Sequence, residues 1–166
     1  LSLSMAITTF VGQNYGAGQM ERIKKGMWTT LIMTVLYTLI SGSLLYHFAP
    51  KLIGLFTKDL KVIEAGVLAS RFLCPFYFLL AILHSLAGTV RGTGKTVPPM
   101  IILLLSLCLF RIMAAKFVIP HYHTIENVYR LYPISWLIGV VLMVGYTIKV
   151  DWIGEKIKFH KNKSID

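Results

Sequence analysis

The chain has 166 residues, of which 55% are hydrophobic and 14% are charged, and its formal net charge is +10 at pH 7. Soluble domains contain about 45–50% apolar and about 25% charged residues, so this composition, with a mean hydropathy of +0.67, indicates a membrane protein. The basic residues lie between apolar runs and in the tail, without a compact basic face interleaved with aromatics. We therefore expect no nucleic-acid partner and interpret the charge as membrane topology.

The apolar runs predict an all-α, polytopic transmembrane helix bundle, because a bilayer crossing needs about 20 apolar residues. The chain begins inside an apolar run, without an initiator Met or a basic leader. We therefore expect a first, truncated span and a chain that is part of a longer protein. The predicted partial lobe covers residues 1–150, with spans at 1–11, 27–49, 66–90, 98–119 and 129–150 and a basic tail at 151–166.

The segments between the spans are polar or amphipathic. Residues 12–26 contain four glycines and predict a polar turn, and residues 51–65 predict an interfacial linker. The segment Arg91–Val97 predicts a reversal in which Gly92 and Gly94 adopt positive φ. Pro98 and Pro99 suit the first turn of the next helix, where their missing N–H groups have no helical partner.

The span 66–90 is the most informative, because it carries Arg71, Pro75 and His84 in an otherwise apolar helix. A lipid-exposed anchor would not keep these residues, whereas one helix of a bundle can. A helical projection at 100° per residue gathers its small and polar side chains on one stripe. That stripe either packs closely against a neighbouring helix or lines a water-filled path; its members are Ser70, Cys74, Tyr77, Ala81, His84, Ser85 and Gly88.

A second polar stripe follows the span 27–49 at helical spacing, and its members are Thr30, Thr34, Tyr37 and Ser41. Threonine hydroxyls in such a span either bond to carbonyls of their own helix or face a path. We take as candidates for a substrate path these four residues together with Ser70, Cys74, Tyr77, Ala81 and His84 of the first stripe.

The basic residues divide unequally between the two sides of the membrane, since successive spans alternate direction. Ten lie on the side of the first turn, the Arg91–Val97 turn and the tail: Arg22, Lys24, Lys25, Arg91, Lys95, Lys149, Lys156, Lys158, Lys161 and Lys163. Five lie on the other: Lys51, Lys58, Lys61, Lys116 and Arg130. The positive-inside rule therefore predicts a cytoplasmic C-terminus.

Enzyme chemistry has no support in the sequence. The GTGKT segment lacks the first glycine of a phosphate-binding loop, and no Asp or Glu interrupts an apolar run. His121 and His123 have no third ligand nearby, so we expect no metal site. Cys74 and Cys108 lie in apolar spans and are expected to be free thiols.

Four stretches, in this order and spacing, resemble the C-terminal part of multidrug and toxic compound extrusion transporters, the MATE family. They are FVGQNYGAGQMERIKKG, FLCPFYFLLAILHSLAGTVRGTGKTVPPM, FRIMAAKFVIP and YPISWLIGVVLMVGYTIK, and they cover nearly the whole chain. The two glycine-rich turns carry most of the specificity, through Gly12, Gln13, Asn14, Gly16 and Gly18 and through Arg91, Gly92, Gly94, Pro98 and Pro99. Family members have twelve helices in two six-helix lobes, so this chain would hold the end of helix eight through helix twelve.

The resemblance implies a secondary active antiporter in the plasma membrane that exports organic cations and drugs in exchange for Na⁺ or H⁺. Its lobes would rock between outward-open and inward-open states, and the partners of this chain would be the lipid bilayer, small organic cations and an N-terminal lobe. No cofactor is implied. This part of the chain has no intramembrane carboxylate, so we expect the coupling-ion site to lie outside it.

Two alternatives to an antiporter remain open at this stage. One is a flippase for polysaccharide or lipid-linked precursors of the same superfamily, and the other is a truncated membrane protein that does not transport.

Tyr37, Tyr77 and Trp136 offer π faces to a cation. Arg71 and Arg111 are expected toward the extracellular leaflet, either as snorkelling anchors or as gating residues. His84 either packs as a neutral ring or senses protons in a path.

Overall fold

The structure is a computed structural model that describes residues 2–118 and 125–149. Within these ranges the chain is helical, with short turns and no strand, as the sequence predicts. Four helical segments are long and apolar enough to cross a membrane: Met20–Gly54, Leu60–Gly92, Val97–Phe117 and Val128–Lys149. The predicted tail, 151–166, lies outside the described residues.

Helix α1 (Ser2–Gly16) and helix α2 (Met20–Gly54) are joined by a turn much shorter than the expected segment 12–26. The backbone N–H of Gln19 donates to the carbonyl of Asn14 across this turn, at 2.8 Å, and Gly18 adopts a φ of +72°. Gly12 and Gly16 instead belong to α1, and neither adopts a positive φ. Helix α2 spans about 52 Å at 1.5 Å per residue, so its charged first turns extend beyond a 30 Å hydrocarbon core.

The third crossing is built from helix α3 (Leu60–Leu73), a 3₁₀ turn (Cys74–Phe76) and helix α4 (Tyr77–Gly92). The break falls at Pro75, which has no N–H to donate and whose ring would clash with the carbonyl four residues earlier in a regular α-helix. Asp59 caps α3 by accepting from the backbone N–H of Lys61 at 2.9 Å. Most of the expected linker 51–65 therefore belongs to helices, since α2 continues to Gly54 and α3 begins at Leu60.

The fourth crossing contains helix α5 (Val97–Leu103), a π-helical segment (Leu104–Leu109) and helix α6 (Phe110–Val118). Pro98 and Pro99 lie in the first turn of α5, as predicted. Helix α7 (Ile125–Lys149) makes the last crossing and carries Pro133 in its interior.

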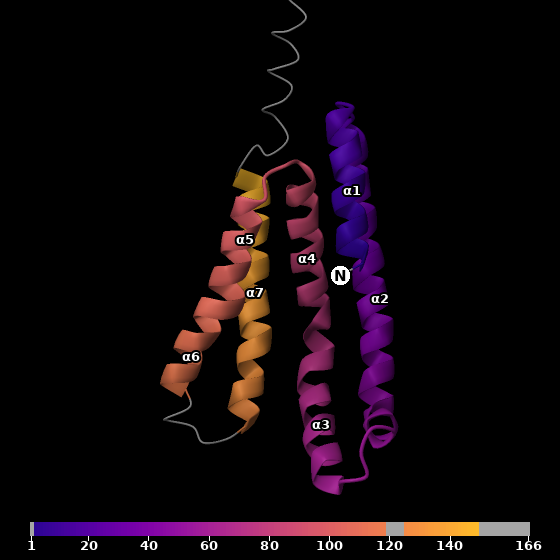
Figure 1. Cartoon of the computed structure of the whole chain (residues 1–166), viewed down its shortest axis with the longest axis vertical. Coiled ribbons are helices and arrows are strands. Elements are labelled where there is room, and N and C mark those ends of the chain that lie inside the picture. The colour runs from indigo at the N-terminus through magenta and orange to yellow at the C-terminus, as the bar shows by residue number, and fades with distance from the viewer. Residues whose placement is uncertain (1, 119–124, 150–166) are drawn as a thin grey trace, which may run out of the picture.

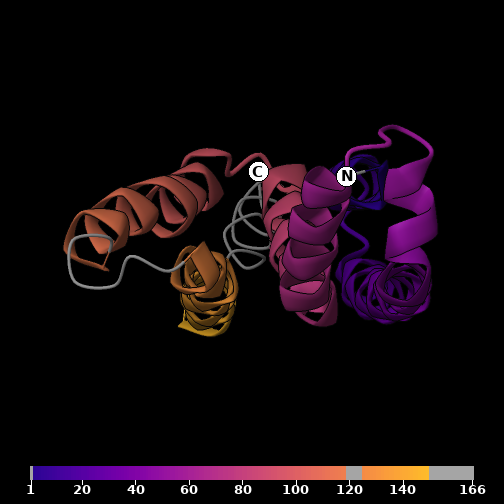
Figure 2. The ribbon, with the colours of Figure 1, turned by 90° about the horizontal axis from the view of Figure 1, so that it is seen from below.

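Helices α3 and α4 lie in the middle of the bundle, with α1 and α2 on one side and α5, α6 and α7 on the other (Figures 1 and 2). The buried core forms where α1, α2, α4 and α7 meet, and it includes Val11, Ile23, Leu83, Val90 and Met143. Many large apolar side chains elsewhere face outward. Ile40, for example, is 65% exposed, which is the pattern of a bundle solvated by lipid.

The alternation of the spans is also as expected. The α1–α2 turn, the α4–α5 turn and the C-terminal end of α7 lie at one end of the bundle, and the α2–α3 turn lies at the other (Figure 1). Helix α1 therefore runs parallel to α4 and antiparallel to α2.

The close approach of α1 to α4 depends on glycines one turn apart. A Cβ at Gly88 would lie 2.6 Å from the carbonyl oxygen of Ser4, and one at Gly92 would lie 2.6 Å from the Cβ of Val11. The expectation that Gly92 adopts positive φ is wrong, because Gly92 ends α4 in helical geometry and the reversal occurs at Gly94, with a φ of +88°. Gly92 is needed for packing of the small-xxx-small type, which membrane helices use in place of a hydrophobic driving force.

Candidate functional site

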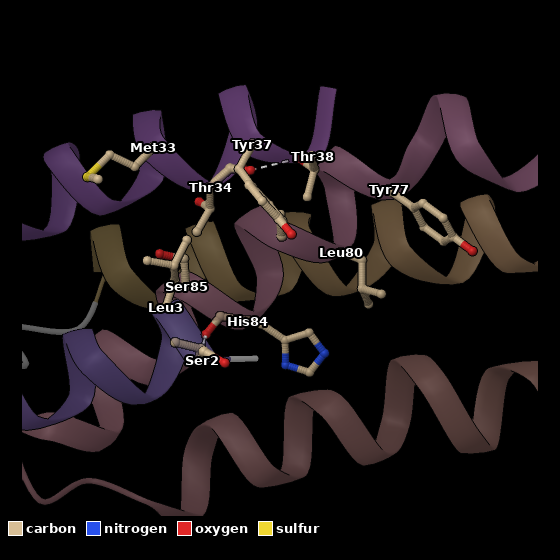
Figure 3. A pocket seen from close by; sticks show the side chains of 12 residues that line it. Ser2, Leu3, Met33, Thr34, Tyr37, Thr38, Tyr77, Leu80, His84 and Ser85 are labelled. Carbon is tan, nitrogen blue, oxygen red and sulfur yellow. Dashed lines mark hydrogen bonds between the residues drawn. The ribbon is translucent and has the colours of Figure 1, made fainter. Parts of the chain in front are cut away.

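A cavity of about 740 Å³ lies among α1, α2 and α4. Helix α2 lines it with Met33, Thr34, Tyr37 and Thr38, and α4 lines it with Tyr77, Leu80, Ala81, His84 and Ser85. The first turn of α1 adds Ser2, Leu3 and Ser4. Figure 3 shows these side chains converging from the three helices. We call this space the polar-stripe cavity.

The polar-stripe cavity brings the two predicted stripes together. Five of the candidate path residues line it: Thr34, Tyr37, Tyr77, Ala81 and His84. Thr30 lines a neighbouring cavity between α1 and α2, whereas Ser41, Ser70 and Cys74 line neither. The 3₁₀ turn at Cys74–Phe76 breaks the helical register, so Ser70 and Cys74 do not continue the stripe of α4.

Sequence reasoning missed the contribution of α1. Ser4 lies on the face of α1 that meets α4, and its hydroxyl donates to the carbonyl of His84 at 2.7 Å. One turn later, the hydroxyl of Thr8 lies 2.9 Å from the carbonyl of Gly88. The spacing of Ser4 and Thr8 by four residues was the available signal, but the segment was treated only as a truncated span.

The threonines of α2 direct their protons to their own helix. The hydroxyl of Thr34 donates to the carbonyl of Thr30 at 2.7 Å, and that of Thr38 donates to Thr34 at 2.8 Å. This is the back-bonding alternative raised by the sequence. The oxygens of Thr34 and Thr38 keep acceptor lone pairs, so they present acceptors rather than donors to the cavity.

Ser85 is a buried polar residue in the wall of the cavity. Its side chain is 1% exposed, and its hydroxyl oxygen has no hydrogen-bond partner among the described residues. A buried hydroxyl without a partner loses free energy relative to water. Because neighbouring atoms seal this oxygen from solvent, Ser85 forms part of the cavity wall without offering a hydrogen bond to a ligand.

The two tyrosines of the cavity differ in how firmly they are held. The ring of Tyr77 stacks on Trp136 of α7, with centroids 5.6 Å apart and planes at 36°. Trp136 is 4% exposed and does not line the cavity, so it orients Tyr77 rather than offering its own π face. Tyr37 is 65% exposed, and its ring is accessible from the cavity side (Figure 3).

Any ionised side chain among the residues that line the cavity would be a cation. Of the residues that the structure describes, no Asp or Glu lines it, and His84 contributes the one imidazole. Arg91, two turns further along α4, approaches the hydroxyl of Ser4 at 3.4 Å. A cationic ligand would therefore meet oxygen acceptors and aromatic faces without a counterion from the residues that line this space.

The two embedded arginines are not equivalent. The Nε of Arg111 donates to the hydroxyl of Ser135 at 2.9 Å, and its guanidinium carbon lies 4.2 Å from the centre of the Tyr132 ring. Arg71 is exposed near the end of α3. These contacts favour the anchoring interpretation for Arg111, and neither arginine lines the polar-stripe cavity.

Gln13 and Asn14, two further residues of the first glycine-rich motif, belong to α1 and do not line the cavity. The amide of Asn14 donates to the carbonyl of Phe10 at 2.7 Å within α1, and Gln13 is exposed. No group of three potential metal ligands occurs among the described residues. His121 and His123 lie outside them.

Comparison with known proteins agrees with this arrangement. Residues 1–116 match the MatE family model. A "Probable multidrug resistance protein NorM" of Thermotoga maritima is 34% identical over 120 residues, which are 72% of this chain and 26% of that protein. A "Probable multidrug resistance protein YoeA" of Bacillus subtilis is 24% identical over 152 residues, covering 88% and 32% of the two chains.

The chain thus spans about a quarter to a third of the length of these curated relatives. The family match covers well over half of the chain, and the described helices form a multi-pass membrane bundle. This chain belongs to the MatE family.

Proposed function

We propose that this chain is part of a secondary active antiporter that exports organic cations and drugs in exchange for Na⁺ or H⁺. The observation that carries the proposal is the polar-stripe cavity, in which five predicted path residues meet on two facing helices. Membership of the MatE family and the printed names of the relatives, which are multidrug resistance proteins, support the same activity.

The cavity suits a small organic cation in size and chemistry. Its volume of about 740 Å³ lies within the usual range of ligand sites, about 300–1,000 Å³. The faces of Tyr37 and Tyr77 each contribute roughly 0.5–2 kcal/mol toward a cation. The oxygens of Thr34 and Thr38 keep lone pairs that can accept hydrogen bonds from an ammonium group.

The coupling ion is bound elsewhere in the whole protein, because no carboxylate of the described residues lines this cavity. We place the protein in the plasma membrane with a cytoplasmic C-terminus, following the distribution of basic residues. Rocking of this lobe against an N-terminal lobe would expose the cavity alternately to the two sides.

A transport assay tests this function. The whole protein is reconstituted into liposomes, and uptake of a fluorescent aromatic cation such as ethidium is measured under an imposed Na⁺ or pH gradient. We expect gradient-driven transport and an apparent KM that rises about 5- to 30-fold in Tyr77→Ala. Tyr77→Phe keeps the π face and should retain near-normal affinity.

Tyr46→Ala is the matched control, because Tyr46 is an exposed tyrosine of α2 that does not line the cavity. Transport that is equally weakened by Tyr46→Ala and Tyr77→Ala would contradict a role for the cavity. Absence of cation transport, with translocation of a lipid-linked precursor instead, would favour the flippase. Absence of both from folded whole protein would favour a membrane protein without transport activity.

A further inference from the structure

A second cavity, of about 520 Å³, lies between α1 and α2 and adjoins the polar-stripe cavity at Leu3 and Met33. Helix α1 lines it with Leu3, Ala6, Ile7 and Phe10, and α2 lines it with Arg22, Lys25, Gly26, Thr29, Thr30 and Met33. We call it the α1–α2 groove. It shares only Leu3 and Met33 with the polar-stripe cavity.

The groove is charged at one end and apolar along the rest of its length. Arg22 and Lys25 lie in the first turns of α2, next to the α1–α2 turn at one end of the bundle (Figure 1). Both side chains are exposed, and among the described residues no Asp or Glu lines the groove. The two cations therefore offer an anion two charged donors from one face of α2, at the level where the helix leaves the apolar core.

The apolar part has the length of one leaflet. From Arg22 to Met33, α2 rises about 16 Å at 1.5 Å per residue, which is about half of a 30 Å hydrocarbon core. On α1, Leu3, Ile7 and Phe10 recur at helical spacing on the side that meets α2. A ligand that fills this groove must place a negative group at the polar end and an extended apolar chain inside the membrane.

Gly26 determines the width of the groove near its charged end. A Cβ at Gly26 would collide with the ring of Phe10, so the glycine lets this ring lie against the backbone of α2. A larger side chain at position 26 would push the ring outward, into the space between the helices. The groove can therefore be closed by a substitution that leaves Arg22 and Lys25 unchanged.

We propose that the α1–α2 groove binds an anionic phospholipid, with the phosphate between Arg22 and Lys25 and an acyl chain along Ile7, Phe10 and Met33. Basic pockets between transmembrane helices at the membrane surface are suited to anionic headgroups. The proposal requires that the bundle is embedded in a bilayer and that the groove faces lipid in the whole protein. It does not depend on the transport function assigned to the other cavity.

Lipid retention by the whole protein tests this inference. The purified protein is mixed with equal amounts of phosphatidylglycerol and phosphatidylcholine in detergent, and bound lipids are counted by native mass spectrometry. We expect a clear preference for phosphatidylglycerol, and Arg22→Gln with Lys25→Gln should lower this preference about 20-fold. Lys24→Gln with Lys149→Gln is the matched control, because it removes two positive charges at the same end from residues that do not line the groove.

Gly26→Leu provides the independent test of the acyl-chain part. It should reduce phosphatidylglycerol retention with both cations present, while thermal unfolding reports whether the bundle remains folded. If the control double variant lost as much of the preference for phosphatidylglycerol, the effect would come from general surface charge, and the proposed site would be overturned. Equal retention of the two lipids by the unmodified protein, or full competition by millimolar inorganic phosphate in place of lipid, would overturn it as well.

Discussion

The guanidinium of Arg111 in α6 lies over the ring of Tyr132 in α7, with 4.2 Å between the guanidinium carbon and the ring centre. The same arginine donates from Nε to the hydroxyl of Ser135 at 2.9 Å. Tyr132 makes an edge-to-face contact with Trp136, which in turn stacks on Tyr77. One charged side chain thus begins a series of ring contacts that reaches the polar-stripe cavity from the opposite side of the bundle.

Replacing Arg111 should weaken the contact between α6 and α7. Arg111→Gln loses the cation–π contact and the charge-assisted hydrogen bond, so we expect a loss of about 1–3 kcal/mol in unfolding free energy. Arg111→Lys keeps the charge without the Nε donor, so its unfolding free energy should lie between those of the unmodified protein and Arg111→Gln. Thermal unfolding of the whole protein in detergent measures the differences.

Arg71→Gln is the control for this comparison, because Arg71 is exposed and the described part of the structure records no polar partner for it. We expect a change within about 0.5 kcal/mol. A loss in Arg71→Gln as large as that in Arg111→Gln would show that the contacts with Ser135 and Tyr132 are not what stabilises the α6–α7 pair.

Gly92 should be intolerant of even a methyl group. In Gly92→Ala the new Cβ would lie 2.6 Å from the Cβ of Val11 and 2.7 Å from the carbonyl oxygen of Thr8, so α1 must move away from α4. We expect a loss of about 1–3 kcal/mol in unfolding free energy and a lower folded yield. Gly145→Ala, in α7, meets nothing within 4 Å and should be neutral or stabilising, since alanine is the better helix former.

Gly94 should be sensitive for a different reason. Its φ of +88° is in the region that β-branched residues avoid, whereas the space around its missing Cβ is open. Gly94→Val should therefore lower folded yield, and Gly94→Asn should be tolerated much better, because asparagine enters left-handed geometry more readily. Similar yields for the two variants, measured by size-exclusion chromatography, would show that backbone geometry at the turn is unimportant.

Labelling of single cysteines should report the orientation. In a variant with Cys74 and Cys108 replaced by alanine, Thr96→Cys in the α4–α5 turn should react with a membrane-impermeant maleimide only after the cells are opened. Lys58→Cys, at the opposite end, should react in intact cells. A reporter fused after Asp166 should be active only in the cytoplasm, and the reverse pattern would invert every span.

His84 should influence the pH profile of export, because its ring lines the polar-stripe cavity beside Tyr37 and Tyr77, with Arg91 further along the same helix. Protonation would add positive charge to a cavity without carboxylates, so affinity for a cation should fall as the pH falls through the pKa of the ring. His84→Gln keeps polarity without titrating, and transport by this variant should lose that acid limb. A wild-type profile at normal folded yield would leave His84 as a packing residue.

Hydropathy and residue spacing were enough to predict the spans and the polar stripes of α2 and α4, because the bilayer sets the length of an apolar run and helical periodicity sets a stripe. The span 66–90 was expected as one continuous helix, so the 3₁₀ turn at Cys74–Phe76, which removes Ser70 and Cys74 from the stripe of α4, was not predicted. The boundaries were less well predicted, because charged first turns such as those of α2 remain helical outside the apolar core.

Only the tertiary structure decided which stripes meet. Ser4 and His84 are 80 residues apart, and the hydrogen bond between them depends on how α1 lies against α4. The need for glycine at position 92 has the same origin, since the atoms that exclude a Cβ there belong to Thr8 and Val11. Likewise, Tyr37 and Tyr77 face one cavity, and Arg111 donates to Ser135, because different helices pack together. Contacts of this kind depend on the relative positions of whole helices, which local periodicity does not encode.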